Sequence, residues 1–456
     1  MRRVVKVSRI RIIITIIVVV LTTLLTGCTG KEPNEIAYVV ALGIDSTDDD
    51  NYKITIQYAN TTQISGGASE SGGKAGSEIV DNVTIEAPNI YAGVGLANNI
   101  VSKSFSMSHA KLIVFSKEIA EKGVKDMIET LVRSEEIRPD VFIAVANTTA
   151  NDYLTSVNPE MEVNPAQYYQ LIYQKNQLVG IPDGQLREFF TGLYTDNYDS
   201  ILPVAGVIEG SGGNSQNDDK GQSKDGQNKG SEGSSESLDS FESKSSNEKD
   251  ENEKEKDAEK NTSKYEYDIK NYIGGETAIE KKNKAEAIGA AVFEKDKMVG
   301  ELGEVETEIC KILKGDYTYS YLTYYNNDTP DIPITVKTTQ QKKPKYKIDT
   351  DKKTVDIELY IESDLYSLPA DYNVENKIED FERDVANYTS STCTEFINNF
   401  TKKYNSDILK LNEKVKYKFL TNNQYNWFKK NVGWSEYKFS VCTNFKVRRT
   451  GLIVRE

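Results

Sequence analysis

Histidine is almost missing from this sequence: His109 is the one histidine among 456 residues. A Ser-His-Asp triad would have to use that single residue, and a metal site built from several histidines is excluded. His109 stands directly before an apolar run, in SMSHA at residues 106–110, a position that favours a histidine satisfied at a strand entry over a catalytic one. We therefore predict no catalytic residues, no metal site and no cofactor.

Cysteine is also scarce, with four residues in the whole chain. No two of them have the CxxC spacing of structural zinc sites, and four are too few for a disulfide scaffold. Cys310, Cys393 and Cys442 lie in the body of the chain. We interpret them as small, partly buried thiols; a single bridge between Cys393 and Cys442 is the alternative.

The apolar run near the start, residues 12–25, is shorter than the ~20 apolar residues of a membrane-spanning helix and contains threonines. A permanent helical anchor is therefore the weaker interpretation. The run is preceded by a cationic stretch with Arg2, Arg3, Lys6, Arg9 and Arg11. A positive start, a short apolar middle and an exit of small residues are the parts of a secretory signal, which we predict at residues 1–27.

The exit of this signal resembles a bacterial lipobox, with Leu25, Thr26 and Gly27 before Cys28. Small residues let the backbone enter a narrow peptidase groove, and the Cys28 thiolate is the natural nucleophile for lipid transfer. We predict cleavage after Gly27, acylation of Cys28 and a lipidated tether at residues 28–35. Because two acyl chains give stable anchoring, the body would lie at the outer face of a membrane. The alternative is a free cysteine after an ordinary signal.

The chain is acidic, with a net charge of −14 and an isoelectric point of about 5.0. Such a charge predicts repulsion from nucleic acid and from anionic lipid head groups. We therefore expect no nucleic-acid partner.

Strand and helix patterns alternate along residues 36–208, which predicts an N-terminal domain of mixed α/β structure. Residues 37–44 form a nearly continuous apolar run, typical of a strand covered on both faces, and residues 52–59 alternate, so the two predict a hairpin. After a short strand at 112–115, Ser116 is placed to cap a helix. The apolar stripe of that helix is Ala120, Val124, Met127, Ile128 and Leu131.

Residues 209–264 differ sharply in composition and consist almost entirely of Gly, Ser, Asn, Asp, Glu and Lys. Their large apolar residues are Leu238 and Phe241. Such a segment cannot bury enough surface to offset its chain entropy, so we predict a disordered acidic linker or insert. A binding tail is the alternative.

The remainder predicts two more domains. Residues 265–330 contain a hairpin at 287–302 and a short helix, and suggest a small middle domain. Residues 331–456 contain strands at 334–348, 355–361 and 437–447 around one helix at 374–404, which has no glycine or proline. The predicted fold class is therefore α+β, or mixed α/β, in three domains, the C-terminal one a sheet covered by one long helix.

Several stretches, in order and spacing, resemble one known family. They are residues 34–45 (NEIAYVVALGID), residues 108–138 with their Arg-x-x-Glu-x-Arg close, residues 289–302 (GAAVFEKDKMVGEL) and the long helix with the ending at 439–451. Together they resemble the C-subunit lipoproteins of spore germinant receptors, the Ger(x)C family. Thr29 and Gly30 depart from the Trp-Asp that many members carry after the cysteine, and the 209–264 insert is a second departure.

The resemblance implies a three-domain lipoprotein on the outer surface of the spore inner membrane, without enzymatic activity. It implies partnership with two integral-membrane subunits, one of them permease-like, in a receptor that senses small nutrients. It assigns no ligand residues to this chain.

The sequence leaves two alternative functions open. A solute-binding lipoprotein of an ABC importer would share the lipobox, but should have two similar α/β lobes around one cleft. A secreted hydrolase would need a base from a carboxylate pair, and 70 acidic residues make some pair inevitable.

Overall fold

The computed structural model describes most of the body of the chain. Its described residues are 13–18, 35–49, 51–59, 80–158, 162, 164–174, 180–195, 197–208, 271–277, 283–326, 329–367, 377–404 and 406–450. The chain divides into two units: Met1–Glu209 with Asn271–Glu456, and Gly210–Lys270, which lies outside the described residues. The predicted signal at 1–27 is described only at residues 13–18, which are helical, and the predicted insert at 209–264 is not described.

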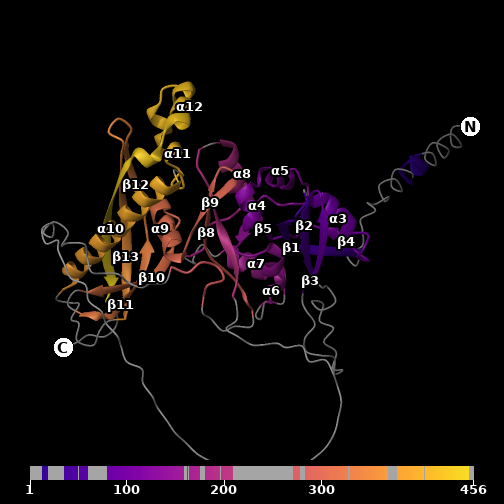
Figure 1. Cartoon of the computed structure of the whole chain (residues 1–456), viewed down its shortest axis with the longest axis horizontal. Helices are drawn as coiled ribbons and strands as arrows, with labels where there is room; N and C mark the ends of the chain where they lie inside the picture. The colour runs from indigo at the N-terminus through magenta and orange to yellow at the C-terminus, as the bar shows by residue number, and fades with distance from the viewer. Residues whose placement is uncertain are drawn as a thin grey trace, which may run out of the picture. The chain divides into compact units, whose positions relative to one another are not determined.

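The first sheet has nine strands. They are β1 (Ile36–Ser46), β2 (Tyr52–Ala59), β3 (Val80–Ala87), β4 (Ser104–Ser106), β5 (Leu112–Ser116), β6 (Phe142–Ala146), β7 (Ile201–Val207), β8 (Ala285–Glu294) and β9 (Lys297–Leu302). Their order is β3-β2-β1-β5-β6-β7-β8-β9, and β4 pairs with β1 (Figure 1). The strands from β1 to β7 in this order are parallel, and the outer pairs are antiparallel. The predicted β1–β2 hairpin is confirmed, as is the two-sided burial of its first strand.

Helices cover both faces of this sheet. They are α3 (Ile90–Ala97), α4 (Lys117–Lys122), α5 (Lys125–Val132), α6 (Ala150–Ser156), α7 (Pro165–Gln174) and α8 (Leu186–Thr195). One core lies under α3, α4, α5 and α8, and a second core, rich in tyrosine, lies under α6 and α7. The strands of this sheet are apolar on both faces, so a layer of helices is needed on each side to bury them.

The helix predicted after Ser116 is two helices, α4 and α5, so the prediction of one continuous helix is wrong. Ser116 caps α4 as predicted, with its Oγ accepting from the Ile119 N–H at 3.4 Å. Between the helices, Gly123 has a φ of 122°, which an L side chain rarely adopts. The predicted stripe, including Leu131, is nevertheless buried, because both helices pack on the same face of the sheet.

The second sheet has five strands. They are β10 (Tyr319–Asn326), β11 (Thr329–Gln340), β12 (Lys345–Asp349), β13 (Thr354–Ser367) and β14 (Lys438–Arg449). The order is β10-β11-β13-β12, and β14 runs parallel to β13. The single strand predicted at 334–348 is two strands, β11 and β12, interrupted before Pro344, whose missing N–H cannot join a ladder.

The predicted long helix is α10 (Ile378–Tyr404), which packs along β14 and buries Phe381, Val385, Ile397 and Phe400. The predicted fold class, mixed sheets with packed helices and a C-terminal sheet covered by one long helix, is confirmed. The described helices include none that is both long enough and apolar enough to span a bilayer.

The segment predicted as a middle domain contributes to both sheets. Its β8–β9 hairpin pairs with β7 and so forms the edge of the first sheet. Its helix α9 (Glu304–Lys314) instead buries Ile309, Ile312 and Leu313 in the core of the second sheet. The predicted domain boundaries remain a prediction, but this segment joins the two sheets through hydrogen bonds on one side and apolar packing on the other.

Four short helices went unpredicted between α10 and β14. They are α11 (Leu411–Val415), a 3₁₀ turn at Lys416–Lys418, α12 (Asn422–Asn431) and a 3₁₀ turn at Trp434–Glu436. α11 and α12 lie at the β12 end of the second sheet (Figure 1).

Candidate functional site

The site residues predicted from the sequence, Cys28 with Leu25, Thr26 and Gly27, lie outside the described residues. His109, just before β5, is exposed, and its ring meets the ring of Tyr38 edge-on with 4.8 Å between centroids. This aromatic contact at the start of a strand matches the position predicted for the histidine.

The three body cysteines are free thiols, so the alternative bridge between Cys393 and Cys442 is not formed. Cys393 is buried in the α10 face, whereas Cys442 is exposed on β14. Burial raises the pKa of Cys393 to about 12. A thiol with that pKa is protonated at neutral pH and is therefore not a nucleophile.

The Gly-Ile-Asp exit of β1 has a structural explanation. The Asp45 carboxylate accepts hydrogen bonds from the backbone N–H groups of Ala150 at 2.6 Å and Asn151 at 3.0 Å, at the start of α6. A Cβ on Gly43 would lie 3.0 Å from the Leu154 side chain and 3.1 Å from Ala150. The motif therefore docks α6 closely on the sheet, and burial raises the pKa of Asp45 above its ordinary value.

The best-connected polar cluster joins the two sheets. We call it the junction and define it as residues 195, 197–200 and 406–434. The Asp407 N–H donates to Asp199 Oδ2 at 2.8 Å, and the Asp199 N–H donates to the Asp407 carbonyl at 3.1 Å. Asp199 Oδ1 also accepts from the Lys295 N–H at 3.3 Å, in the β8–β9 turn. One aspartate therefore connects three segments that are distant in the sequence.

Asp407 is fully buried at the start of α11. Its two carboxylate oxygens accept from the backbone N–H groups of Leu411 at 2.7 Å and Asn412 at 2.8 Å. Burial raises the pKa of Asp407 to about 7, and it outweighs these two hydrogen bonds, which act in the opposite direction. The carboxyl group therefore changes charge near neutral pH at a point that fixes α11.

Charged and aromatic side chains surround this pair. Lys410 Nζ lies 3.2 Å from Glu188 Oε2 and 4.2 Å from the centroid of the Tyr198 ring. Burial acts to raise the pKa of Glu188, but the Lys410 charge and hydrogen bond outweigh it and lower the pKa. On α12, Lys429 Nζ donates to the Thr195 carbonyl at 2.9 Å, so α12 is fastened to the end of α8.

Two hollows adjoin the junction and share Tyr198 and Asp199 in their linings. One has a volume of about 370 Å³, and its lining includes Asp183, Glu188, Lys314 and Lys410. The other has a volume of about 560 Å³ and extends towards α12. Both are polar, and the lining of the first includes the Glu188–Lys410 ion pair.

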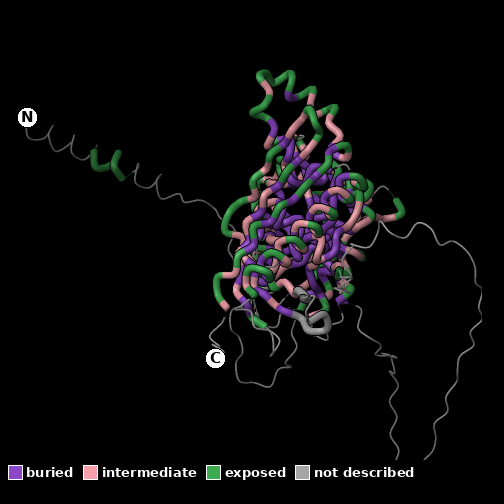
Figure 2. Tube along the Cα trace, turned by 90° about the vertical axis from the view of Figure 1, so that its left-hand side faces the viewer, coloured by how far each residue is buried: buried purple, intermediate pink, exposed green. Residues whose placement is uncertain are grey.

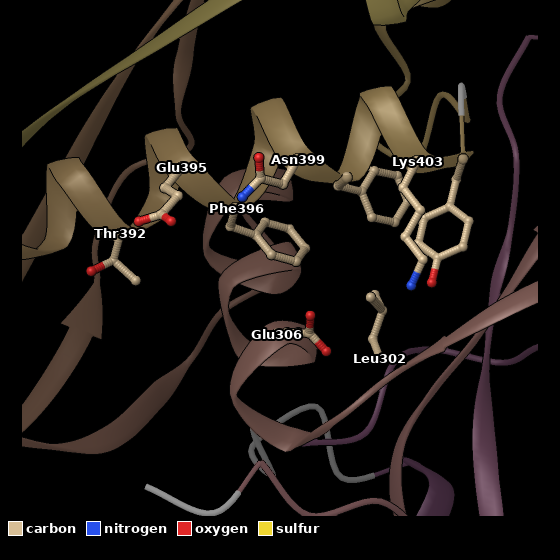
Figure 3. Close-up of a pocket in the computed structure, with 9 residues that line it drawn as sticks. Leu302, Glu306, Thr392, Glu395, Phe396, Asn399 and Lys403 are labelled. Atoms are coloured by element: carbon tan, nitrogen blue, oxygen red, sulfur yellow. The ribbon is translucent and has the colours of Figure 1, made fainter. Parts of the chain in front are cut away.

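A third hollow, of about 260 Å³, lies between α9 and α10. Figure 3 shows Glu395, Phe396 and Lys403 extending from α10 towards Glu306 and Leu302. Glu306 is already engaged, because its Oε2 accepts from the Gly303 N–H at 3.0 Å and from Asn271 Nδ2 at 2.9 Å. Its carboxylate holds the start of α9 and is not free for a ligand.

Within the part of the chain that the structure describes, no three His, Cys, Asp or Glu side chains are placed to share a metal ion. The carboxylates of Asp199 and Asp407 in the junction, of Asp45 at the start of α6 and of Glu306 at the start of α9 all accept hydrogen bonds from backbone N–H groups. These carboxylates position segments of the chain. Sequence reasoning could not find the Asp199–Asp407 pair, because the two residues lie 208 positions apart.

Comparison with known families gives two matches that together span most of the chain. Residues 30–207 match the family described as spore germination protein N-terminal domain. Residues 288–451 match the family described as spore germination B3/GerAC like, C-terminal. The unmatched stretch between them contains the predicted insert.

Curated relatives from Bacillus subtilis (strain 168) include spore germination protein KC, 26% identical over 174 residues, and spore germination protein B3, 26% identical over 148 residues. These alignments cover 35% and 30% of this chain, and 42% and 36% of the relatives. The chain thus spans about two fifths, or less, of the length of the curated relatives it matches.

Among solved structures, the crystal structure of the GerBC protein matches with a TM-score of 0.47 and 15% identity, over 89% of this chain and 96% of that one. The ordered matches at both ends of the sequence decide the family. The chain belongs to the GerAC-like family of spore germination proteins.

Proposed function

We propose that the chain is a lipid-anchored, non-catalytic subunit of a spore germinant receptor. One observation carries the proposal: the lipobox at residues 25–28 stands directly before the N-terminal family match at residue 30, and the C-terminal match follows on the same chain. An acylated Cys28 would thus hold both family domains at a membrane.

The proposed partners are membrane lipid, through the acyl chains on Cys28, and two integral-membrane receptor subunits, one of them permease-like. The proposed location is the outer face of the cell membrane or of the spore inner membrane. A tether confines the body to a thin layer and raises its effective concentration at the membrane subunits to the order of mM. Individually weak contacts can then hold the receptor together.

The importer alternative has less support. Neither family match supports an importer. A solute-binding lipoprotein should also have two similar lobes, whereas one of the two described sheets has nine strands and the other has five. The catalytic alternative would need a free nucleophile or base, whereas the buried carboxylates of the junction are held by backbone amides.

The anchor is tested by Cys28→Ala. The variant should accumulate as an unacylated precursor, and after its signal is removed it should leave the membrane fraction in a high-salt wash. Retention of the processed variant in washed membranes would show that the lipid is not the anchor.

The receptor role is tested in spores. Deletion of the coding sequence should abolish germination with one set of nutrients, and tagged protein from dormant spores should recover a permease-like membrane subunit after crosslinking. Recovery of an ATP-driven importer, without such a subunit, would contradict the proposal.

A further inference from the structure

The segment between α11 and the last 3₁₀ turn exposes large apolar side chains. We call residues 416–431 the tip. Tyr417, Leu420 and Trp427 are 80%, 94% and 68% exposed, and Leu420 is the most exposed large apolar side chain of the described residues. In Figure 2 the top of the molecule, where Figure 1 places α11 and α12, is largely exposed. Grouped exposed apolar side chains mark surfaces that meet a partner or a membrane.

Leu420 directly precedes the cap of α12, a position from which an apolar side chain often packs on the helix, but Leu420 does not pack there. Thr421 caps α12, with its Oγ1 accepting from the Gln424 N–H at 3.2 Å. The residue before a cap often packs on the fourth helical residue, here the buried Tyr425. The ring of Phe419 occupies that position instead, 5.9 Å from the Tyr425 ring, and Leu420 points to solvent.

The inner face of the tip is firmly seated, so its outer side chains are presented in a fixed arrangement. The Phe419 and Phe428 rings are 4.9 Å apart, and Phe428 contacts the buried Trp434 at 6.1 Å. The Tyr425 hydroxyl donates to the Asn412 carbonyl at 3.0 Å. The exposure of Leu420 and Trp427 therefore belongs to a well-packed structure.

The tip and α11 are basic, although the whole chain is strongly acidic. Residues 411–431 contain five lysines and one glutamate, against a net charge of −14 for the chain. Lys416, Lys418 and Lys430 are exposed and stand within three residues of Tyr417, Leu420 or Trp427 in the sequence. Lys418 also donates to the Ile348 carbonyl. The predicted repulsion of the body from anionic head groups is thus reversed locally.

We propose that the tip docks on an anionic lipid surface, with Leu420 and Trp427 inserted at head-group depth and the lysines facing lipid phosphates. Tryptophan and tyrosine prefer the interface of a bilayer, and lysines near an anionic leaflet add attraction. Lysine is depleted in protein–protein interfaces, which favours lipid over a protein partner. The proposal goes beyond the receptor role and does not require acylation of Cys28.

The two tryptophans of the chain make the test direct, because Trp427 is exposed and Trp434 is only 2% exposed. Full-length protein is reconstituted with phosphatidylglycerol vesicles or phosphatidylcholine vesicles that carry brominated acyl chains. Trp427 emission should shift to the blue and be quenched in phosphatidylglycerol. In Trp427→Phe, the remaining Trp434 emission should be unaffected by either lipid.

Charge and insertion are tested separately by variants at exposed positions. Lys416→Glu and Lys430→Glu should each lower the ratio of docked to undocked tip at least about fivefold, and added salt should do the same. Leu420→Ser should also reduce quenching. Lys284→Glu, a charge reversal outside the tip, is the matched control and should leave quenching unchanged.

Equal, unquenched Trp427 emission in both lipids would overturn the proposal, as would quenching that ignores the charge reversals. Protection of Trp427 only when a membrane protein is present would also overturn it, by assigning the surface to a protein. The outcomes are independent of the receptor role: that role fails if no receptor subunit is recovered, whatever the tip does.

Discussion

The side chain of Asn398 in α10 hydrogen-bonds both backbone groups of Phe439 in β14. Its Nδ2 donates to the Phe439 carbonyl at 3.0 Å, and the Phe439 N–H donates to its Oδ1 at 3.1 Å. The pattern continues along the strand: the N–H groups of Val441, Thr443 and Val447 donate to Thr394 Oγ1, Ser390 Oγ and Glu382 Oε1 at 3.0, 2.9 and 2.8 Å.

The regular spacing of these hydrogen bonds between α10 and β14 has a geometric cause. Four helical residues rise about 6 Å and two strand residues about 6.6 Å, so every fourth residue of α10 meets every second residue of β14. The helix thereby covers an edge strand whose amides would otherwise be open to pairing.

Asn398→Leu should destabilise the protein, because it keeps the volume of the side chain but leaves both Phe439 groups without their partner. We expect a loss of about 1–3 kcal/mol in the free energy of unfolding, measured by denaturant titration. The matched control is Asn399→Leu at the neighbouring exposed position, which should change stability by less than about 0.5 kcal/mol. Equal effects would show that the two hydrogen bonds contribute nothing.

Leu131→Ala tests the core under α5. Leu131 is fully buried, so the variant should lose ~2–5 kcal/mol through lost burial and a cavity. Its neighbour Val132 is 40% exposed, and Val132→Ala should cost far less. A thermal melt that ranks the two variants in the opposite order would contradict the assigned face.

Asp407 predicts a pH dependence of stability. Its pKa is raised from 3.8 to about 7 in the folded protein, so the folded state holds the proton more tightly than the unfolded chain. Its stabilising contribution is therefore full below pH 3.8 and declines as the pH rises towards 7, by up to about 1.4 kcal/mol per pH unit.

Asp407→Asn should flatten this decline in unfolding titrations between pH 4 and 7, because the amide does not ionise. Asp140→Asn, at an exposed carboxyl group, is the control and should leave the profile unchanged. A decline of the same slope in Asp407→Asn would assign the pH dependence to other groups.

Removal of residues 211–261, with a short flexible linker in their place, should leave the melting temperature nearly unchanged. The segment has the composition of chain that forms no core, so its removal should delete no packing. A large fall in melting temperature would mean that it packs on a folded part.

Local patterns predicted β1, β2, α7, α10 and β14 well, because each combines an apolar run or a clear hydrophobic period with a recognisable start or end. The break at Gly123 was missed because the buried stripe continues through it, and the conformation there is set by a tertiary contact. A Cβ at that position would lie 2.7 Å from Asp296 Oδ2, in the distant β8–β9 turn.

The junction and the tip lacked any local signal. The Asp199–Asp407 pair joins residues 208 positions apart, and such a contact leaves no trace in periodicity or spacing. The tip was missed because its helices are short and its apolar residues face outwards, so no buried stripe marks them.

Val207 and Ala285 are paired neighbours on β7 and β8, and Ile208 N–H donates to the Lys284 carbonyl at 2.8 Å. The ends of these two strands, from which the connection leaves and to which it returns, thus lie side by side. In topological terms β7 and β8 form a hairpin, whose strand order and register are fixed by the ladder between them. The connection between β7 and β8 is therefore a suitable insertion site for a fluorescent or affinity reporter, with which the protein can be followed in a living spore.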